Sequence, residues 1–577
     1  MGMPEQLAEM LAGNHGPTKQ KAARLVVDLA ASAGATEFIE CTHAHVSGVS
    51  VITGGHGLRR FLADISGDTK GRVSIPTTLN SSGCDKNKFD EMGIDYDDFL
   101  KIQFEIILAY ENLGIDATLS CTPYEIEEEL KGFGSWAESN AVCFSNSYTG
   151  LITNRESGLS ALATALTGWA PKWGLHLEEN RKPNILVNVE AEMDNITDWS
   201  ILGDWIGKQV QSSWHLPWGP MPHITGLPKW ASFEMKKALT AAAANYGSPL
   251  LWADGHTEPA PPCSYEGKLT FTNYDLQQRY DELAPKGEVD LVVIGCPQAS
   301  LGEIRSTAAA VRTRMELGEK IPNNRLWVFT SGHSHELAEA DGTIELLEEA
   351  GALILKDTCP EVTPYNRSKY NHLLTNSLKA EHYLTSGLNR MPTSVATIET
   401  CVAAAFNPTK FEGTRPTLES RAKEPHSSAK THQTGKGEMI GKNLPSQNKW
   451  NIKGKALVTD VPITYLGYVN RDTGVIEEPG HPLDGVAIED SILIYPKGSG
   501  STVAPFVLMG LIYTGKGPKA IINRDVCPLT LPAASLLNVP YSYGFDNDPC
   551  LTINNGDEIE MNLSNNEVKL KIISRCA

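Results

Sequence analysis

Apolar strands and amphipathic helices alternate along most of this chain, and this alternation limits the folds open to it. In residues 96–126, apolar side chains recur at helical spacing from Phe99 to Leu113. Gly114 follows and is well placed to end the helix, and residues 115–120 then read as a strand. The segment therefore predicts a helix, a turn and a strand.

Two further segments repeat the pattern. Residues 288–315 read as a buried strand that turns into a long helix, and residues 343–364 read as a helix, a glycine and another strand. Parallel strands need helical crossovers, so alternation of this kind favours parallel sheets covered by helices. We expect residues 1–405 to form a large α/β body.

The sequence changes character after that body. Residues 406–450 are rich in Lys, Arg, Ser, Pro and Gly and lack periodicity, which is typical of a linker or a long surface loop. Residues 451–577 carry short apolar runs separated by Gly, Pro and Asn. This pattern predicts a smaller, β-rich second domain, and a chain of 577 residues is long enough for several such units.

Charge and hydropathy narrow the class of protein. The net charge is −19, from 50 Lys and Arg against 69 Asp and Glu, which disfavours nucleic acid or an anionic membrane as a partner. No apolar run approaches the roughly 20 residues of a membrane span, and no secretory signal is visible at the start. We expect a cytoplasmic metabolic protein.

Three of the eleven cysteines occur in matched contexts. Cys121 in "SCTPY", Cys296 in "GCPQ" and Cys359 in "TCPE" are placed just beyond predicted strand ends. Ligands of open α/β sheets bind at the carboxyl ends of strands, and thiolates from separate loops can jointly hold iron. Core packing is the alternative, since cysteine is among the most buried residues.

Polar side chains form two further groups. His43 and His45 share one face if residues 42–50 form a strand, although solvated histidines on an edge strand would give the same pattern. Thr78 and Asn80 are good donors to a carboxylate but also ordinary turn residues.

Residues 135–158 place polar groups among apolar residues at spacings that do not suit a surface helix. Such groups need partners, so the segment predicts either an internal network or a binding site. Arg155 could bind a substrate carboxylate in a bidentate fork. The default interpretation of Lys379, in "NSLKAEHYL", is an exposed helix residue.

The stretch "SILIYPKGSGSTVAPF", residues 491–506, is a buried strand followed by small, flexible residues. A plain turn, a phosphate-binding loop and a displayed catalytic hydroxyl all fit such a stretch. The stretch alone does not decide among them.

Taken together, these segments resemble the aconitase X family. The resemblance runs over nearly the whole chain and includes "AHVSGVS", "CTPY", "WAESNAV", "TNRESG", "IGCPQASLGEI", "DTCP", "HPLDG" and "YPKGSGST". It implies an aconitase-like, multi-lobed α/β body at 1–405, a linker at 406–450, and a mobile swivel domain at 451–577 that closes over the active site.

The resemblance also implies the site residues. An iron–sulfur cluster would be held by Cys121, Cys296 and Cys359, and its open iron would act as a Lewis acid. Aligning "GSGST" with the family's "GRGSS" makes Ser501 the base that removes a proton from carbon. Ser499 stands where aconitases carry an activating arginine, which leaves Lys497 as one candidate for that role.

Ten residues of the matching motifs are then expected to contact the substrate. They are His45, Ser47, Thr78, Asn80, Glu138, Ser139, Asn140, Asn154, Arg155 and Lys379.

The implied reaction is a dehydration, and two substrates are known in the family. Single-chain members dehydrate cis-3-hydroxy-L-proline to Δ1-pyrroline-2-carboxylate, whereas members split into two subunits dehydrate mevalonate 5-phosphate. This chain is in one piece, so we predict the hydroxyproline reaction, a small-molecule substrate and a monomer. A non-catalytic, RNA-binding relative and a serine or cysteine hydrolase are the alternatives, and the negative charge argues against the first.

Overall fold

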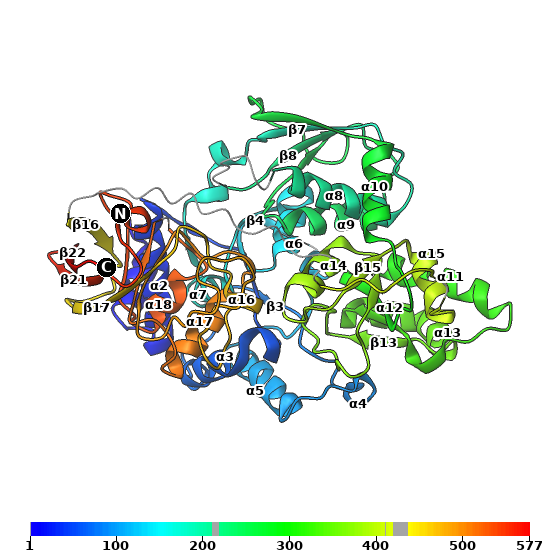
Figure 1. The fold of residues 1–577 in the computed structure, drawn as a ribbon, viewed down its shortest axis with the longest axis horizontal. Helices are drawn as coiled ribbons and strands as arrows, with labels where there is room; N and C mark the ends of the chain where they lie inside the picture. The colour runs from blue at the N-terminus through cyan, green and yellow to red at the C-terminus, as the bar shows by residue number, and fades with distance from the viewer. Residues whose placement is uncertain are drawn as a thin grey trace.

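The structure is a computed structural model that describes residues 2–127, 129–210, 218–409, 411–418, 437–524 and 526–576. Three parallel sheets with helices packed against them form the body, and a closed barrel with its own helices forms the C-terminal part (Figure 1). This arrangement confirms the predicted α/β fold with a smaller β-rich domain.

The first sheet has the strand order β3-β2-β4-β5, with all neighbours parallel. Its strands are β2 (His43–Val46), β3 (Thr77–Leu79), β4 (Lys131–Trp136) and β5 (Gly150–Arg155). The helices of this lobe are α2 (Pro17–Ala33), α3 (Val51–Ser66), α5 (Phe99–Asn112), α6 (Ser139–Tyr148) and α7 (Gly158–Thr167).

Helix α5 confirms the predicted helix, and its buried face carries Phe99, Ile102, Ile106 and Tyr110. The strand predicted for residues 115–120 is wrong. Within that run, Asp116 makes a single bridge to Thr78, and the other residues do not form a strand.

The second sheet, at the top of Figure 1, has the order β10-β7-β8-β9. It comprises β7 (Ile185–Val189), β8 (Pro222–Thr225), β9 (Trp252–Ala253) and β10 (Gly267–Phe271). Three helices accompany it: α8 (Ile196–Val210), α9 (Phe233–Ala244) and α10 (Asn273–Leu283).

The third sheet has the order β13-β12-β11-β14-β15, again with all strands parallel. Its strands are β11 (Leu291–Ala299), β12 (Leu326–Thr330), β13 (Leu353–Lys356), β14 (Leu373–Thr375) and β15 (Thr393–Val395). Its helices are α11 (Leu301–Met315), α12 (Gly332–Ala340), α13 (Thr343–Glu349), α14 (Leu378–Ser386) and α15 (Ile398–Phe406).

Both units predicted in this third sheet are confirmed. The strand and helix of residues 288–315 are β11 and α11, and those of residues 343–364 are α13 and β13. All nine residues of β11 are buried, as expected for a strand covered by helices on both faces.

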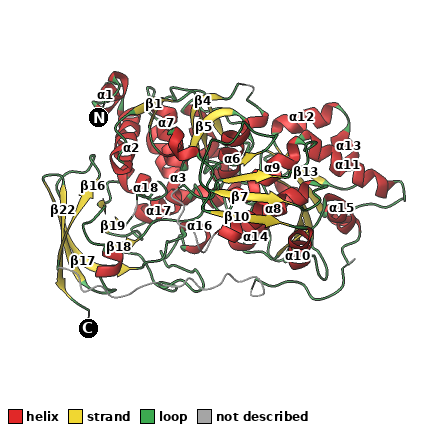
Figure 2. Ribbon diagram, turned by 90° about the horizontal axis from the view of Figure 1, so that it is seen from above, coloured by secondary structure: helices red, strands yellow, loops and turns green. Residues whose placement is uncertain are grey.

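The C-terminal barrel closes in the order β16-β20-β19-β18-β17-β21-β22. Several of its strands are seen at the left of Figure 2. Its strands are β16 (Glu438–Asn443), β17 (Asn451–Val458), β18 (Ile492–Tyr495), β19 (Ala520–Asn523), β20 (Tyr541–Tyr543), β21 (Glu558–Ser564) and β22 (Glu567–Ser574). Strand β16 falls inside the segment 406–450 expected to be a linker, whereas residues 419–436 of that segment lie outside the described residues.

Helices α17 (Ala504–Tyr513) and α18 (Leu531–Leu536) connect this barrel to the body. Helix α17 packs on α3, α18 packs on α2, and one apolar core runs through all four. The buried Asp28 of α2 accepts hydrogen bonds from the backbone N–H of Ser446 (2.9 Å) and the hydroxyl of Ser535 (2.6 Å).

Helices α3 and α17 pack closely because glycines face the contact. A methyl group added to Gly57 of α3 would lie 2.5 Å from the backbone of Gly510 in α17. The ring of Phe506 occupies the space beside Gly48 and Gly158, where an added Cβ would lie 1.9 Å and 2.8 Å from its carbons.

Among the described residues, no helix is both long and apolar enough to cross a membrane.

Candidate active site

The three cysteines predicted as iron ligands come from three separate segments of the body, and all three are buried. Cys359 lies in the loop after β13, as the sequence pattern predicts. Cys296 lies inside β11 and not beyond its end, because this strand continues to Ala299. Cys121 follows residues 117–120, which are irregular and do not form the expected strand.

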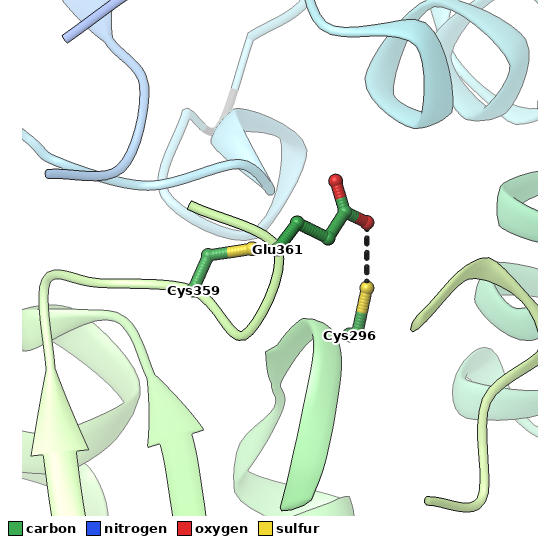
Figure 3. Close-up of side chains that lie close together, drawn as sticks. All are labelled: Cys296, Cys359 and Glu361. Carbon is green, nitrogen blue, oxygen red and sulfur yellow. Dashed lines mark hydrogen bonds between the residues drawn. The ribbon is translucent and has the colours of Figure 1, made fainter. Parts of the chain in front are cut away.

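The structure nevertheless brings two of the thiols, those of Cys296 and Cys359, together beside a carboxyl group. Cys121 and Cys296 both influence the pKa of the Cys359 thiol, which lies well above its usual value. Cys296 Sγ also donates a hydrogen bond of 2.9 Å to Glu361 Oε1, and the ligand atoms of Cys296, Cys359 and Glu361 lie within 4.8 Å of one another. Figure 3 shows Cys359 and Glu361 projecting from one loop, with Cys296 facing the Glu361 carboxylate.

These residues suit an iron–sulfur cluster in chemistry. Burial raises the pKa of the Cys296 thiol to about 11 and that of Cys121 well above its usual value, so both thiols hold their protons when nothing is bound. A metal would displace these protons and stabilise the thiolates. Thiolates from three buried Cys residues are donors of the kind that such clusters use.

Charged side chains lie next to the thiols. Lys379, predicted by default to be an exposed helix residue, is buried, so that interpretation is wrong. Its ammonium lies 2.8 Å from Glu361 Oε1 and 3.3 Å from Glu138 Oε1, and Asn80 Nδ2 donates to Glu138 Oε2 at 2.8 Å. Burial opposes the charge of Lys379, but the two carboxylates outweigh it and raise its pKa well above the usual value.

Four segments supply this group of charges. Asn80 directly follows β3, Glu138 precedes α6, Lys379 begins α14, and Glu361 lies in the loop after β13. The carboxyl ends of parallel strands thus bring together residues that are far apart in the sequence.

Ser501 lies beside these charges, although it follows β18 of the C-terminal barrel. Ser501, Asn80, Glu138, Glu361 and Tyr383 line one cavity of about 50 Å³. Residues from the body and from the loop after β18 therefore share this cavity.

The Ser501 loop also contacts the body directly. Arg155 Nη2 donates a hydrogen bond of 3.2 Å to the carbonyl of Gly500, and the hydroxyls of Ser47 and Thr502 lie 3.4 Å apart. The backbone N–H of Val503 points to Ser501 Oγ at 3.4 Å.

A larger cavity of about 490 Å³ adjoins the same loop. Arg155, Lys497, Ser499 and Ser501 are among the residues that line it. Lys497, the candidate for activating Ser501, thus borders the same space as the serine.

His45 and Thr78 form a buried pair. His45 Nδ1 lies 2.8 Å from Thr78 Oγ1, while Nε2 finds no hydrogen-bond partner among the described residues. Burial, with a smaller effect of His43, lowers the pKa of His45 to about 3, so the ring is neutral. The alternative of solvated edge-strand histidines is wrong, because β2 lies between β3 and β4.

The remaining residues predicted to contact the substrate lie near the cysteines or hydrogen-bond to neighbouring loops. Asn140 Nδ2 donates to the carbonyl of Cys121 at 2.9 Å, and Ser139 is buried at the start of α6. Asn154 is engaged elsewhere, since its Oδ1 accepts from Leu175 N–H at 2.7 Å and its Nδ2 lies 3.2 Å from His176 Nδ1.

Sequence reasoning missed Glu361. It stands two residues after Cys359 in "TCPE", and its carboxyl group contacts both a predicted iron ligand and Lys379. An acidic residue beside a thiol in a predicted loop was the available signal, but acidic residues are common in solvated loops. Burial raises the pKa of Glu361 even though Lys379 acts in the opposite direction.

Three domains of one family match the sequence. Residues 1–179 match the Aconitase X first domain, residues 289–407 the Aconitase X third domain, and residues 446–570 the Aconitase X swivel domain. The resemblance seen in the motifs is thereby confirmed.

Curated relatives cover both parts of the chain. The phosphomevalonate dehydratase large subunit of Thermococcus kodakarensis is 35% identical over 387 residues, which is 65% of this chain and 93% of that protein. The cis-3-hydroxy-L-proline dehydratase of Pseudomonas aeruginosa is 32% identical over 417 residues, 69% of this chain and 68% of that protein. The phosphomevalonate dehydratase small subunit of Pyrococcus abyssi is 34% identical over 135 residues, 23% of this chain and 96% of that subunit.

A solved structure agrees with these relatives. The crystal structure of Thermococcus kodakaraensis aconitase X in its holo-form superposes with a TM-score of 0.62 at 31% identity, covering 70% of this chain and 99% of that one. With three matched domains and relatives that are dehydratases by name, this chain belongs to the aconitase X family and is a hydro-lyase of that family.

Proposed function

We propose that this enzyme dehydrates cis-3-hydroxy-L-proline to Δ1-pyrroline-2-carboxylate. The observation that carries the substrate choice is the union of body and swivel domain in one chain. The large- and small-subunit relatives that match this chain in separate pieces are named for phosphomevalonate, whereas the hydroxyproline relative aligns over 417 residues of a single protein.

The charges of the small cavity support the same choice. Its lining includes the carboxyl groups of Glu138 and Glu361, and Lys379 lies against both of them. A ring ammonium can pair with a carboxylate there, whereas a phosphate would meet like charge. This charge pattern favours a zwitterionic amino acid over a phosphorylated hydroxy acid.

In this proposal, Ser501 takes the proton from the carbon alpha to the substrate carboxylate. The electron pair of that C–H bond forms the double bond as the neighbouring C–O bond breaks, and the hydroxyl leaves as water after gaining a proton. The resulting enamine then tautomerises to the ring imine. A serine hydroxyl is a weak base, so it needs donors that favour the alkoxide, and the N–H of Val503 and the cation of Lys497 are the candidates here.

Cys121, Cys296 and Cys359 would hold the iron–sulfur cluster. When bound, the cluster would supply the Lewis acidity that assists departure of the hydroxyl. Arg155 bridges the body to the Ser501 loop, from which it can orient a substrate carboxylate. We assign the body to residues 1–405 and the swivel domain to residues 451–577, and Glu438–Asn443 contributes one strand to the swivel barrel.

Mevalonate 5-phosphate is the second candidate, because one observation favours it. The larger cavity beside Ser501 is lined by Arg155 and Lys497, and two cations can bind a phosphate.

Anaerobic incubation of the iron-loaded enzyme with each substrate in turn separates the two candidates. Formation of Δ1-pyrroline-2-carboxylate from cis-3-hydroxy-L-proline, with no turnover of mevalonate 5-phosphate, is the expected result. The opposite preference would replace the proposed substrate. Ser501→Ala serves as the control. Its turnover should fall by more than about 10²-fold, because general-base catalysis accelerates a reaction by at least that factor, while its bound iron should be unchanged.

A further inference from the structure

One buried amide contacts the segments of all three cysteines. The Gln298 side chain is almost completely buried, and its Oε1 accepts a hydrogen bond of 3.0 Å from the backbone N–H of Cys121. Its Nε2 lies 2.9 Å from the carbonyl of Thr358, 3.1 Å from that of Leu119 and 3.3 Å from that of Thr330. Thr358 and Leu119 are close neighbours of Cys359 and Cys121 in the chain.

Gln298 is joined to the third cysteine by the backbone, since it stands two residues after Cys296 in β11. Its own N–H donates to Cys121 Sγ at 3.3 Å. The residue therefore contacts a predicted ligand sulfur through its main chain and the loops of two ligands through its side chain.

A second buried group fixes the position of Gln298. The ammonium of Lys237 donates to the carbonyl of Gln298, and it also contacts Glu303 at 2.7 Å and Glu125 at 3.2 Å. Glu303 in turn caps α11 by accepting from the N–H of Ser300 at 3.0 Å. The carbonyl of Gln298 is thus held to the start of the helix that follows β11.

The loops that Gln298 joins make only isolated bridges, Asp116 to Thr78 and Thr358 to Ser82, among the described residues. Residues 117–120 are irregular, and the loop after β13 leaves the sheet before Cys359. Buried backbone groups in such loops need side-chain partners, and Gln298 supplies four of these contacts.

We propose that Gln298 is a positioning residue that holds the three cysteine segments, strand β11 and two loops, at the spacing required for joint metal binding. The inference rests on the proposed assignment of Cys121, Cys296 and Cys359 as ligands. Outer-sphere partners that orient metal ligands are worth about 10- to 100-fold in metal affinity. Loss of the Gln298 amide is therefore expected to speed metal release by that factor.

Two variants test the proposal. Gln298→Leu removes all four side-chain hydrogen bonds, and Gln298→Glu keeps the size and one acceptor while placing a carboxylate oxygen against three carbonyls. Each protein is reconstituted anaerobically with iron and sulfide. Iron and sulfide per chain, the visible spectrum, and the rate of iron loss to a chelator are then measured.

Gln103 offers a matched control elsewhere in the body. It is also buried, and its amide makes three backbone hydrogen bonds, to Val49, Val51 and Gly83. Gln103→Leu should lower stability in urea to a similar degree, yet release iron at the wild-type rate. Equal iron loss in this control would overturn the proposal, as would wild-type retention in any folded Gln298 variant.

A second probe separates this inference from the cofactor assignment. Cd²⁺ binds convergent thiolates whether or not iron is the resident metal. Wild-type protein that binds Cd²⁺ through three thiolates but takes up no iron would refute the iron assignment, while Cd²⁺ release from the Gln298 variants would still test the positioning role. If wild-type protein bound Cd²⁺ no more tightly than Gln298→Leu, the positioning role itself would be refuted.

Discussion

A single buried ammonium, that of Lys379, lies against both carboxylates beside Ser501. An ion group of this kind is costly to break, because removal of one partner leaves the others buried without compensation. Lys379 contacts Glu361, and Glu361 accepts a hydrogen bond from Cys296. The charged residues of the cavity are therefore in direct contact with one of the predicted iron ligands.

Lys379→Met should therefore destabilise the protein by about 3–5 kcal/mol, the usual cost of breaking a buried pair. The loss should be smaller at pH 5 than at pH 8, because a carboxyl with a raised pKa can regain its proton as the pH falls. Urea unfolding at the two pH values measures the difference. The double variant Lys379→Met/Glu361→Gln should recover part of the loss, and no recovery would contradict this account of the charges.

His45 gives a pH dependence with a definite sign. Its pKa is lowered to about 3 in the fold against about 6.5 in the unfolded chain, so protons bind the unfolded state more readily. The stability that neutral His45 contributes is full above pH 6.5 and falls as the pH drops, by about 1.4 kcal/mol per pH unit. His45→Gln should reduce this slope between pH 6.5 and 5 in urea titrations. An unchanged slope would show that His45 is not held neutral.

The packing of α3 on α17 allows a matched pair of substitutions at the scale of elements. A Cβ on Gly57 would meet the backbone of Gly510 at 2.5 Å, whereas a Cβ on Gly510 would lie 3.8 Å from Gly57 Cα. We expect Gly57→Ala to cost about 1–3 kcal/mol through overpacking. Gly510→Ala should be neutral or stabilising by up to about 1 kcal/mol, because alanine favours a helix.

Thermal unfolding and turnover of the two glycine variants measure this difference. Since α17 follows the Ser501 loop directly, Gly57→Ala should also lower turnover more than Gly510→Ala does. Equal effects of the two substitutions would mean that the helices do not meet as described.

Some of these elements could be predicted from the sequence and others could not, and the difference has a physical cause. The unit that begins with β11 could be predicted, because a wholly buried strand and a capped helix leave strong local patterns. The run 115–120 could not, because beside β3 it makes one bridge, Asp116 to Thr78, and the Thr118 hydroxyl then takes the N–H and carbonyl of Leu79 in place of a ladder. Nor could the sequence tell whether β2 is central or at an edge, because neighbours in a sheet are set by the whole chain.

The site shows the same division. The strand-end context of Cys359 could be recognised, whereas Cys296 lies inside β11 and Cys121 follows an irregular run. Glu361 and Gln298 could not be recognised from the sequence, because their importance lies in contacts with segments far away in the sequence. Lys379 was misjudged because a lysine on an amphipathic helix is usually solvated, and the two carboxylates that allow its burial come from a different lobe (Glu138) and from another loop of its own lobe (Glu361).

At the scale of the whole molecule, the interface between body and swivel domain is extensive enough to predict association without a covalent link. It includes a shared apolar core, the Phe506 ring beside Gly48, and Asp28 with its two serine partners. The relatives named as large and small subunits match the two parts separately.

We therefore expect two co-produced chains, residues 1–418 and 437–577, to elute together in gel filtration and to restore turnover. The break removes only residues outside the described part of the fold. Gly57→Ala in the split protein serves as the control and should weaken the association. Separate elution of the two unmodified pieces would contradict an interface that is stable on its own.

The single chain has a consequence for how activity responds to dilution. In a two-chain enzyme, the fraction of assembled sites falls once the protein concentration drops below the dissociation constant of the subunits. In this protein the swivel domain meets its body at a local concentration fixed by the connecting chain, whatever the bulk concentration. Each translated molecule also carries one body and one swivel domain, so turnover per molecule stays constant from a dilute cell to a concentrated one, and neither half is ever made in excess.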